Sequence, residues 1–448
     1  MKYIIVLSLL FCNFLCSAQQ LDPQQLAHDK ARAAKGDTAA MYNMGMYYFY
    51  GEGVPKDLVK SRTWLQKASD KGHAHAMLQL GMIYEEGKGV KKDAAKALTL
   101  FRKAAKKGDV DAMNEIGVIY SEAIGVKKDM AEAIKNFKMA AENGSTEAMN
   151  TLALCYAKGN GVAKDVSISL QWLNKAADKG DVFAMNDLGF FYSSPELGND
   201  CIKAMEWYMK ARDMGDSAAL PPIGEMALEG KCKDADYKKI AQWMKKYADL
   251  GDGDACFFMA AFYAENIGVE HNYVKAMNLL MQDAEILIKK NVQENEAIDQ
   301  LFSLYDSGNL GEEDQQKMLK WFEDIADKTN DDGMMAGIGY IYTNKEHPTR
   351  QDYAKAMTWS MRSADKGNPT GFYNVGYLYA NGLGVKEDDA KGFEWIMKAA
   401  QKGDKVAMRT IGDFYQNGQG VPANRDKAME WHTKAKQGEK ESDEKQGE

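Results

Sequence analysis

The sequence predicts an all-α fold: a right-handed α-solenoid of about eleven two-helix repeats with a period of 36 residues. Three observations lead to this prediction, namely glycines at a fixed interval, eight tryptophans that share one position in their repeats, and a helix-capping residue at a constant offset from each tryptophan or its equivalent. The chain has 448 residues, more than the roughly 250 to 300 at which a single hydrophobic core stops growing. A stacked array, whose core extends along one axis, is therefore expected.

The glycines set the period. They recur at intervals of 36 residues early in the chain, and the same interval returns near its end: Gly36, Gly72, Gly108, Gly144 and Gly180, then Gly367 and Gly403. All eight tryptophans share one phase, but Trp243 and Trp321 are 78 residues apart, six more than two periods. A fixed period of this length is typical of stacked helical repeats, and the six extra residues predict an irregular repeat between these tryptophans.

Each repeat is expected to begin with a helix that carries a small residue and, three positions later, a tyrosine, as at Gly81 and Tyr84. This spacing places both on one helical face, where glycine permits close backbone approach. A Gly-x-Gly-Val turn follows, for example at 87–90, and its glycines suit the left-handed backbone that ends a helix. The second helix then aligns alanine and an aromatic residue, as at Ala204 and Trp207, and we predict that this stripe is core.

A short carboxylate or amide side chain stands seven residues before each tryptophan or its equivalent. Such side chains accept hydrogen bonds from the free backbone N–H groups that begin a helix. We predict that they cap the second helix of every repeat: Asp57, Asp93, Asp129, Asp165, Asp200, Asp236, Asn272, Asp314, Asp352, Asp388 and Asn424.

The sixth repeat departs from the pattern. Pro221 and Pro222 stand inside its expected first helix, and Ala227 replaces its tyrosine. A kink or a widened groove is predicted there, because proline cannot donate a helical hydrogen bond.

Together these motifs resemble the Sel-one-like repeats, which are relatives of the tetratricopeptide repeats. The matching pattern is Leu-Gly-x-x-Tyr, then Gly-x-Gly-Val, then Asp, then Ala-x-x-Trp and Ala-Ala-x-x-Gly, and it covers roughly residues 36–438. The resemblance implies a tetratricopeptide-like superhelix whose first helices line the concave side. It also implies a role as an adaptor or scaffold, often in the bacterial envelope, without naming a partner.

The N-terminus is typical of a secretory signal peptide. Lys2 precedes an apolar stretch over 4–15, and Cys16, Ser17 and Ala18 place small residues three and one before a cut after Ala18. We therefore expect an exported protein, periplasmic or secreted. The chain would divide into a signal peptide at 1–18, a lead-in at 19–35, repeats one to seven at 36–284, a degenerate or inserted repeat at 285–332, repeats nine to eleven at 333–438, and a charged disordered tail at 439–448.

Charge and motif content favour binding over chemistry. The formal charge is −8 with acidic and basic residues interleaved, so we expect no nucleic-acid partner, and no segment after the signal approaches the roughly 18 apolar residues of a membrane span. No nucleophile, base and orienting group recur together, and His73 and His75 lack a third ligand. We therefore expect a chain that is not an enzyme and that holds no metal or cofactor.

The expected function is a protein-interaction scaffold that binds a protein or peptide segment in its concave groove. Asn114, Asn150 and Asn186 are spaced by 36 residues and would align amide donors and acceptors for an extended backbone, unless they merely cap helices or face water. A glycan-binding or envelope-assembly role is the alternative, since amide and aromatic side chains also suit sugars. Aromatic anchors are expected on the same inward side, although partial burial explains them equally well: Phe183, Phe190, Tyr340, Tyr373 and Tyr377.

Four cysteines remain after removal of the signal peptide. Cys201 and Cys232 fall near the intra-repeat turns of neighbouring repeats and form a candidate disulfide, provided that their Cα atoms lie within about 7 Å. Cys155 and Cys256 occupy apolar first-helix positions, which indicates buried free thiols.

Overall fold

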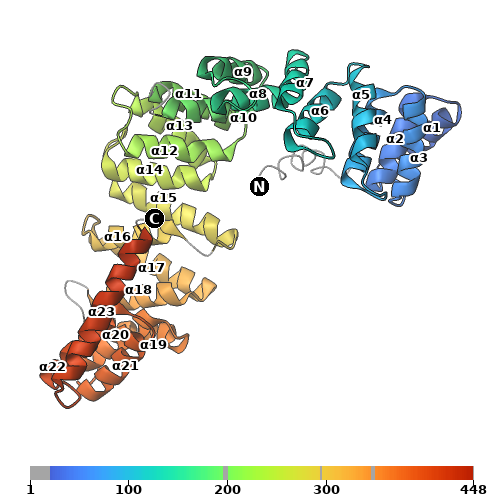
Figure 1. Cartoon of the computed structure of the whole chain (residues 1–448). Helices are drawn as coiled ribbons and strands as arrows, with labels where there is room; N and C mark the ends of the chain where they lie inside the picture. The colour runs from blue at the N-terminus through green and yellow to red at the C-terminus, as the bar shows by residue number, and fades with distance from the viewer. Residues whose placement is uncertain (1–20, 195–199, 293–294, 345–348, 447–448) are drawn as a thin grey trace. The chain divides into compact units, whose positions relative to one another are not determined.

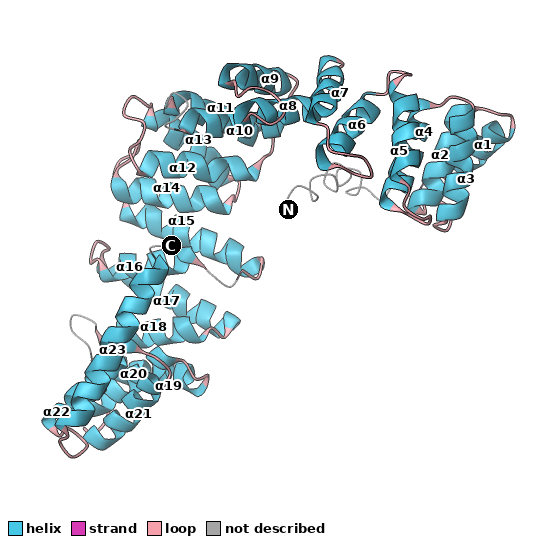
Figure 2. Cartoon of the chain, in the orientation of Figure 1, coloured by secondary structure: helices cyan, strands magenta, loops and turns pink. Residues whose placement is uncertain are grey.

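The computed structural model describes residues 21–194, 200–292, 295–344 and 349–446. Over these ranges every regular element is a helix (Figures 1 and 2). The helices follow one another in repeated pairs, so the predicted all-α solenoid of two-helix repeats is confirmed. The chain divides into two units, Met1–Asp234 (unit 1) and Ala235–Glu448 (unit 2).

Unit 1 holds a leading helix, five complete repeats and the first helix of the sixth. The first helix of each repeat is called the A helix, and the second the B helix. The elements are α1 (Pro23–Ala34), α2 (Thr38–Tyr50), α3 (Leu58–Asp70), α4 (Ala74–Glu86), α5 (Ala94–Ala105), α6 (Val110–Glu122), α7 (Met130–Glu142), α8 (Thr146–Lys158), α9 (Val166–Asp178), α10 (Val182–Ser193), α11 (Cys201–Asp213), a short 3-10 helix (Ser217–Ala219) and α12 (Leu220–Leu228).

Unit 2 begins with the B helix of the sixth repeat and continues with five A–B pairs. Its helices are α13 (Tyr237–Asp249), α14 (Gly253–Glu265), α15 (Tyr273–Lys289), α16 (Glu296–Asp306), α17 (Glu312–Thr329), α18 (Asp332–Thr343), α19 (Arg350–Asp365), α20 (Pro369–Ala380), α21 (Asp389–Gln401), α22 (Lys405–Asn417) and α23 (Arg425–Gln446).

The predicted caps of the B helices are confirmed in nine repeats and wrong in two. Asp129 is typical of the nine: its Oδ1 accepts the Glu132 N–H at 3.0 Å. Asp314 and Asp352 lie inside the first turn instead, because α17 and α19 begin earlier and have 18 and 16 residues. In α19 the cap is Thr349, and it forms a capping box with Asp352. The Thr349 hydroxyl accepts the backbone N–H of Asp352, and the Asp352 carboxylate accepts the backbone N–H of Thr349.

The Gly-x-Gly-Val turn ends the A helix and also joins neighbouring repeats. Gly87 has φ +75° and ends α4, as the sequence predicts. Gly89 also has a positive φ, and a Cβ atom placed there would lie 2.9 Å from the Cβ of Leu58, the first residue of the preceding B helix. The second glycine is therefore needed for repeat stacking, a role that the turn motif alone does not indicate.

A small residue in most A helices lets the B helix of the same repeat approach; the exception is α16, where Phe302 stands at this position and stacks on Phe322. A Cβ atom on Gly117 would lie 2.5 Å from the Phe137 ring, and Phe137 is 1% exposed. The predicted close approach is therefore confirmed. On the other side of the A helices, Ala76, Ala112 and Ala148 are fully buried at equivalent positions, so small side chains set the spacing between helices.

The tryptophans are less buried than the sequence predicts. Trp359 is enclosed, but the others are only half-buried, as Trp172 in α9 illustrates. Lys175 Nζ lies 4.2 Å from the centroid of the Trp172 ring, in a cation–π contact. The core residue is Leu173, 2% exposed, since one helical step turns the next side chain by about 100° toward the core.

The N-terminal lead-in contains α1, which packs against α2. Its Asp29 is completely buried, and Oδ2 accepts hydrogen bonds from Tyr47 Oη at 2.8 Å and from Asn43 Nδ2 and Gln25 Nε2, both at 3.1 Å. These bonds, with Leu21 and Leu26 against the first core cluster, let α1 cover the first repeat as a preceding B helix would.

Two further segments differ from expectation. Pro221 and Pro222 lie in the first turn of α12, after a separate 3-10 turn, so they begin a short helix and do not kink a long one. The last helix, α23, continues to Gln446, into the segment 439–448 for which composition suggests disorder. Its many Lys, Glu and Gln residues have high helix propensity, which accounts for the difference.

Candidate functional site

The A helices α6, α8 and α10 of unit 1 carry the strongest candidate site. Positions 2, 6 and 9 of an A helix share one face, because they are three or four residues apart. At seven of these nine positions the three successive repeats present a carboxylate or a large apolar side chain, and all of the seven except Glu115 are exposed. We call this surface the acidic–aromatic face, and it consists of Asp111, Glu115, Glu147, Leu154, Phe183, Asp187 and Phe190.

The two predicted phenylalanine anchors lie on this face. Phe183 and Phe190 of α10 are 59% and 67% exposed, and they stand two helical turns apart with Asp187 between them. Leu154 of α8 occupies the position equivalent to Phe190 and is 40% exposed. Exposed apolar side chains that line up over two repeats form a contiguous hydrophobic patch, which indicates an interaction site, whereas single exposed apolar residues do not.

The asparagine ladder lies beneath this face and joins the repeats. Asn150 Nδ2 donates to Asp181 Oδ1 of the next repeat at 3.0 Å, and Asn186 Nδ2 donates to Asp216 in the same way. Asn114 donates to Glu147, again one repeat along the chain. The amide donors are therefore used within the array.

The amide oxygens of the ladder are enclosed. The Oδ1 atoms of Asn114, Asn150 and Asn186 are buried and accept no hydrogen bond from the described residues. A segment lying on the face would therefore meet the side chains at positions 2, 6 and 9, and it could reach the ladder only if those side chains moved. The expectation that the ladder grips a peptide backbone directly is not supported by this geometry.

The carboxylates of the acidic–aromatic face raise one another's pKa. Burial raises the pKa of Glu115 to about 8, and repulsion from Glu85, Glu147 and Asp111 adds to the shift. The pKa of Glu147 is raised by desolvation, which outweighs the hydrogen bond from Asn114, and Asp111 and Asp181 raise it further. Nearby carboxylates thus favour the neutral form of each group.

These carboxylates are absent from the candidates that the sequence motifs suggest, although the sequence carries a signal for them. Asp111 and Glu147 are one period of 36 residues apart, and Glu115 and Asp187 are two periods apart. The same 36-residue periodicity that marks the asparagines therefore also marks these carboxylates. That none of them forms an ion pair with another described residue, however, becomes visible only in the structure.

The predicted tyrosines lie in unit 2. Tyr340 of α18 and Tyr377 of α20 share position 9 of their A helices and are 48% and 38% exposed. Tyr373 is half-buried, and its ring centroid lies 6.3 Å from that of Tyr377, with the rings stacked. Nearby Asn374 is buried and donates through Nδ2 to the Ala336 carbonyl at 2.9 Å.

His73 and His75 serve the junction between the first two repeats. His73 caps α4 by accepting the Ala76 N–H through Nδ1 at 3.2 Å, and its ring stacks on Tyr42. His75 Nδ1 lies 2.6 Å from Asp109 Oδ2. Across the residues that the structure describes, no three His, Cys, Asp or Glu side chains are grouped so as to hold a metal ion, and no described helix is long and apolar enough to cross a membrane.

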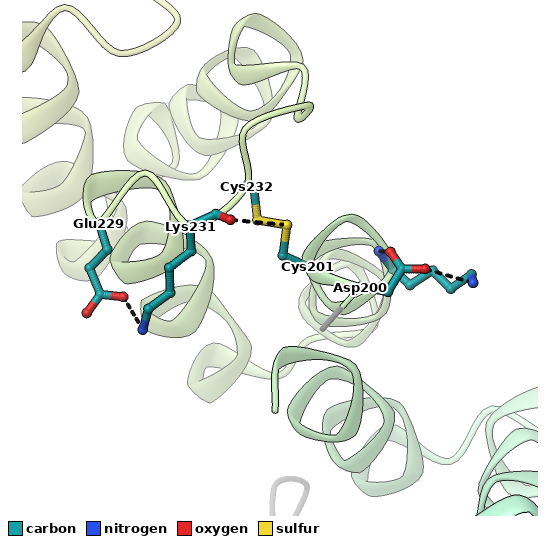
Figure 3. The surroundings of a disulfide bond; sticks show 6 residues. Asp200, Cys201, Glu229, Lys231 and Cys232 are labelled. Atoms are coloured by element: carbon teal, nitrogen blue, oxygen red, sulfur yellow. Dashed lines mark hydrogen bonds and ion pairs between the residues drawn. A yellow bond between two sulfur atoms is a disulfide. The ribbon is translucent and has the colours of Figure 1, made fainter. Parts of the chain in front are cut away.

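The cysteines lie in two different environments. Cys201, at the start of α11, is joined to Cys232 after α12, and their Cα atoms are 5.6 Å apart (Figure 3). The predicted free thiols Cys155 and Cys256 are confirmed as free and buried. Burial raises the pKa of both thiols, which makes them poor nucleophiles.

Structural comparison gives a relative that extends over nearly the whole chain. A protective antigen present in uropathogenic Escherichia coli strains, described as displaying an SLR fold, is 28% identical, covers 94% of this chain and 90% of its own, and superposes with a TM-score of 0.50. A Sel1 repeat protein from Oxalobacter formigenes is 35% identical over 47% of this chain and 87% of its own, with a TM-score of 0.41.

Sequence comparison agrees. A component of an ERAD-associated E3 ubiquitin-protein ligase, HRD3B of Arabidopsis thaliana, is 32% identical over 74 residues, which is 16% of this chain and only 11% of that relative. The Sel1 repeat model matches residues 38–73, 74–109, 110–145, 146–181, 182–216, 253–280, 334–368, 373–404 and 406–438. With more than half of its residues matched, and with the repeat geometry described above, this chain belongs to the Sel1 repeat family.

Proposed function

We propose that this chain is an exported, non-enzymatic scaffold that binds a protein segment on the acidic–aromatic face of unit 1. Sel1 repeat proteins are generally protein-interaction scaffolds, and this family membership supports the general role. The observation that carries the specific proposal is the exposure of Phe183 and Phe190 on one face of α10. Two aligned phenylalanine side chains in contact with water are unfavourable in free energy, and a partner that buries them would remove this cost.

Two features support export. The N-terminal signal pattern, with a cut after Ala18, lies outside the described residues and is supported by sequence alone. The Cys201–Cys232 pair adds a second argument, because disulfides persist mainly in oxidising compartments. We expect that the protein, isolated from the envelope without reductant and then denatured, reacts with maleimide only at Cys155 and Cys256, because Cys201 and Cys232 are joined in the disulfide. Labelling of all four cysteines would contradict a periplasmic or secreted location.

The binding proposal is tested by affinity capture from envelope extract with the mature chain, residues 19–448, as bait. A Phe183→Ser, Phe190→Ser variant should lose a protein that the wild type retains. The matched control is Leu250→Ser with Met429→Ser, which removes two apolar side chains that are 74% and 65% exposed elsewhere. Equal capture by wild type and the phenylalanine variant would contradict the proposal, as would equal losses in variant and control.

Glycan binding is the second candidate, and its support lies in unit 2. Tyr340 and Tyr377 are exposed at equivalent positions, and the stacked Tyr373 extends the aromatic surface. Flat aromatic faces of this kind suit sugar rings as well as peptides. Binding that glycosidase treatment of the bound material abolishes, and that Tyr340→Ser with Tyr377→Ser weakens, would favour this function over capture of a protein segment by unit 1.

A further inference from the structure

The carboxylates of the acidic–aromatic face lack cationic partners. Among the described residues, no ion pair involves Asp111, Glu115, Glu147 or Asp187. Several acidic residues of the B helices, by contrast, pair with lysine along the same helix: Glu132 lies 3.1 Å from Lys135, and Glu430 lies 2.7 Å from Lys434. The four carboxylates of the acidic–aromatic face therefore lack the lysine partners that these B-helix residues have.

Glu115 makes this deficit costly. Its side chain is only 8% exposed, yet in the described structure no side chain or backbone group forms a hydrogen bond or ion pair with its carboxyl group. A carboxyl group whose side chain is this deeply buried and has no protein partner calls for an explanation, even though its oxygens are not fully enclosed like the Oδ1 atoms of the asparagine ladder. A ligand that supplies the missing cation to Glu115 is such an explanation, and it is independent of how many acidic residues surround the site.

Neighbouring groups hold the site ready for a cation. Asn114, 3% exposed, donates to Glu147 and so fixes that carboxylate beside Glu115. Two basic side chains act on the cluster from its margins, Lys92 on Glu85 and His75 on Asp111, and neither forms an ion pair with Glu115. The charged and titratable groups facing the cluster from α4, α6, α8 and α10 and their caps are His75, Glu85, Glu86, Lys92, Asp109, Asp111, Glu147, Asp181 and Asp187.

The spacing of the face suits an extended chain. Packed helices are about 8–10 Å apart, and a strand-like peptide advances about 3.3 Å per residue, so about every third residue can reach the next repeat. Such a segment would meet Glu115 on α6, then Glu147 on α8, and then the phenylalanines of α10. Charge and apolar surface are thus arranged in sequence along one track.

We propose that the acidic–aromatic face binds an extended cationic protein segment, in which Lys or Arg side chains pair with Glu115 and Glu147 and an apolar side chain packs on Phe183 and Phe190. This inference rests on the proposed function and adds the chemistry of the partner. Charge complementarity identifies the occupant, since the face offers four carboxylates and none of them forms an ion pair with another described residue.

Binding of this kind is linked to protons. Pairing with a cation favours the ionised form of Glu115, so the segment releases a proton when it binds below the raised pKa of this group. The affinity should therefore rise as the pH increases from about 5 to 8, and it should fall as salt screens the charges. A purely apolar contact with Phe183 and Phe190 would show neither dependence.

The test is fluorescence anisotropy with the mature chain and a labelled peptide rich in lysine and phenylalanine, compared with the same peptide in which every lysine is acetylated. Glu115→Gln with Glu147→Gln should weaken binding of the lysine peptide roughly tenfold or more, and should remove its pH dependence. Glu142→Gln is the matched control, because Glu142 is exposed on the B helix α7 and pairs there with Lys138. Melting curves establish that all variants are folded.

The outcomes separate this inference from the proposed function. If both peptides bind equally well and Phe183→Ser with Phe190→Ser abolishes binding, the face captures protein segments but not through charge, and only the inference fails. If neither the glutamine nor the serine variant changes binding, both proposals fail. Weakening by Glu142→Gln as large as that by the double variant would reduce the effect to net charge and overturn the inference. Tight Ca²⁺ binding that requires Glu115, without peptide binding, would overturn it as well.

Discussion

The A helices of the two units carry different side chains on one common scaffold. In α6 of unit 1, positions 2 and 6 are Asp111 and Glu115, whereas in α18 of unit 2 the same positions are Gly333 and Gly337. Position 9 is an exposed aromatic in both units, as Phe190 and Tyr340 illustrate. The face formed by α6, α8 and α10 of unit 1 is therefore acidic as well as aromatic, while that of α18 and α20 is aromatic without carboxylates at these positions.

The B helices of the two units are alike. Phe137 and Phe322 occupy the same repeat position and are 1% and 0% exposed. Lysines three residues after Trp172 and Trp395 lie over these rings in both units. Stacking fixes the B helices and the turns, because each contacts the next repeat, whereas the side chains at positions 2 and 9 of the A helices are mostly exposed and vary between repeats. Differences in partner chemistry are expected at those positions.

The largest expected effect concerns the shared scaffold. Phe137→Ala and Phe322→Ala should each lower the free energy of unfolding by about 3–5 kcal/mol, because each leaves a cavity in a close-packed core. Urea unfolding, followed by hydrogen exchange to locate the loss, would measure both. The loss should stay within the mutated unit, since repeats contact mainly their neighbours.

Similar losses at Phe137 and Phe322 would support a common scaffold. A loss below about 1 kcal/mol at either position would mean that one unit tolerates a cavity that the other does not. In that case the two units would differ in packing as well as in surface chemistry.

A smaller effect is expected at Glu115, and it depends on pH. The pKa of the Glu115 carboxyl group is about 8 in the folded chain, whereas its ordinary value, expected in the unfolded chain, is 4.5. Between these pH values the folded state keeps a proton that the unfolded state has lost, so the stability of the fold decreases as the pH rises from 4.5 to 8. Glu115→Gln removes the charge and should raise the free energy of unfolding at pH 8 by on the order of 2–4 kcal/mol. Below pH 4.5 the variant and the wild type should be about equally stable.

Chemical denaturation at pH 4 and pH 8 would measure this effect. Gly337 occupies the equivalent position in unit 2, so that part of the A-helix surface contributes no such term. Glu142→Gln serves as the control for the loss of one negative charge, since its carboxylate is exposed and faces Lys138. A Glu115 variant that is no more stable than wild type at pH 8 would mean that the carboxyl group already has a partner.

Local sequence patterns predict the scaffold well and the binding surface poorly. The positive φ of Gly87, the close contact of Gly117 with Phe137 and the cap at Asp129 all follow from residues a few positions away. The predicted caps at Asp314 and Asp352 are wrong because α17 and α19 begin earlier than the pattern suggests. No local sequence motif indicates how many residues are added at the N-terminal ends of these helices.

The ladder and the carboxylates depend on contacts between repeats. Asn150 meets Asp181 only because stacking places residues 31 positions apart side by side. The isolation of Glu115 likewise depends on which groups three successive A helices present together. Periodicity locates such residues in the array, but whether a side chain is satisfied or unpartnered is decided by its neighbours in space.

The smallest expected effect concerns the ladder. Asn150→Ala or Asn186→Ala should each lower the free energy of unfolding by only about 1 kcal/mol, because each removes a hydrogen bond to a carboxylate but also an enclosed oxygen that lacks a partner. Asp181 keeps a partner, since its Oδ1 also accepts the Ala184 N–H at 2.8 Å. Binding of the lysine peptide should change little in either variant, because neither amide lies on the acidic–aromatic face. A variant that melts like the wild type but no longer binds the peptide would mean that the ladder asparagines contact the bound segment. In that case the side chains at positions 2, 6 and 9 would have to move on binding to expose these amides.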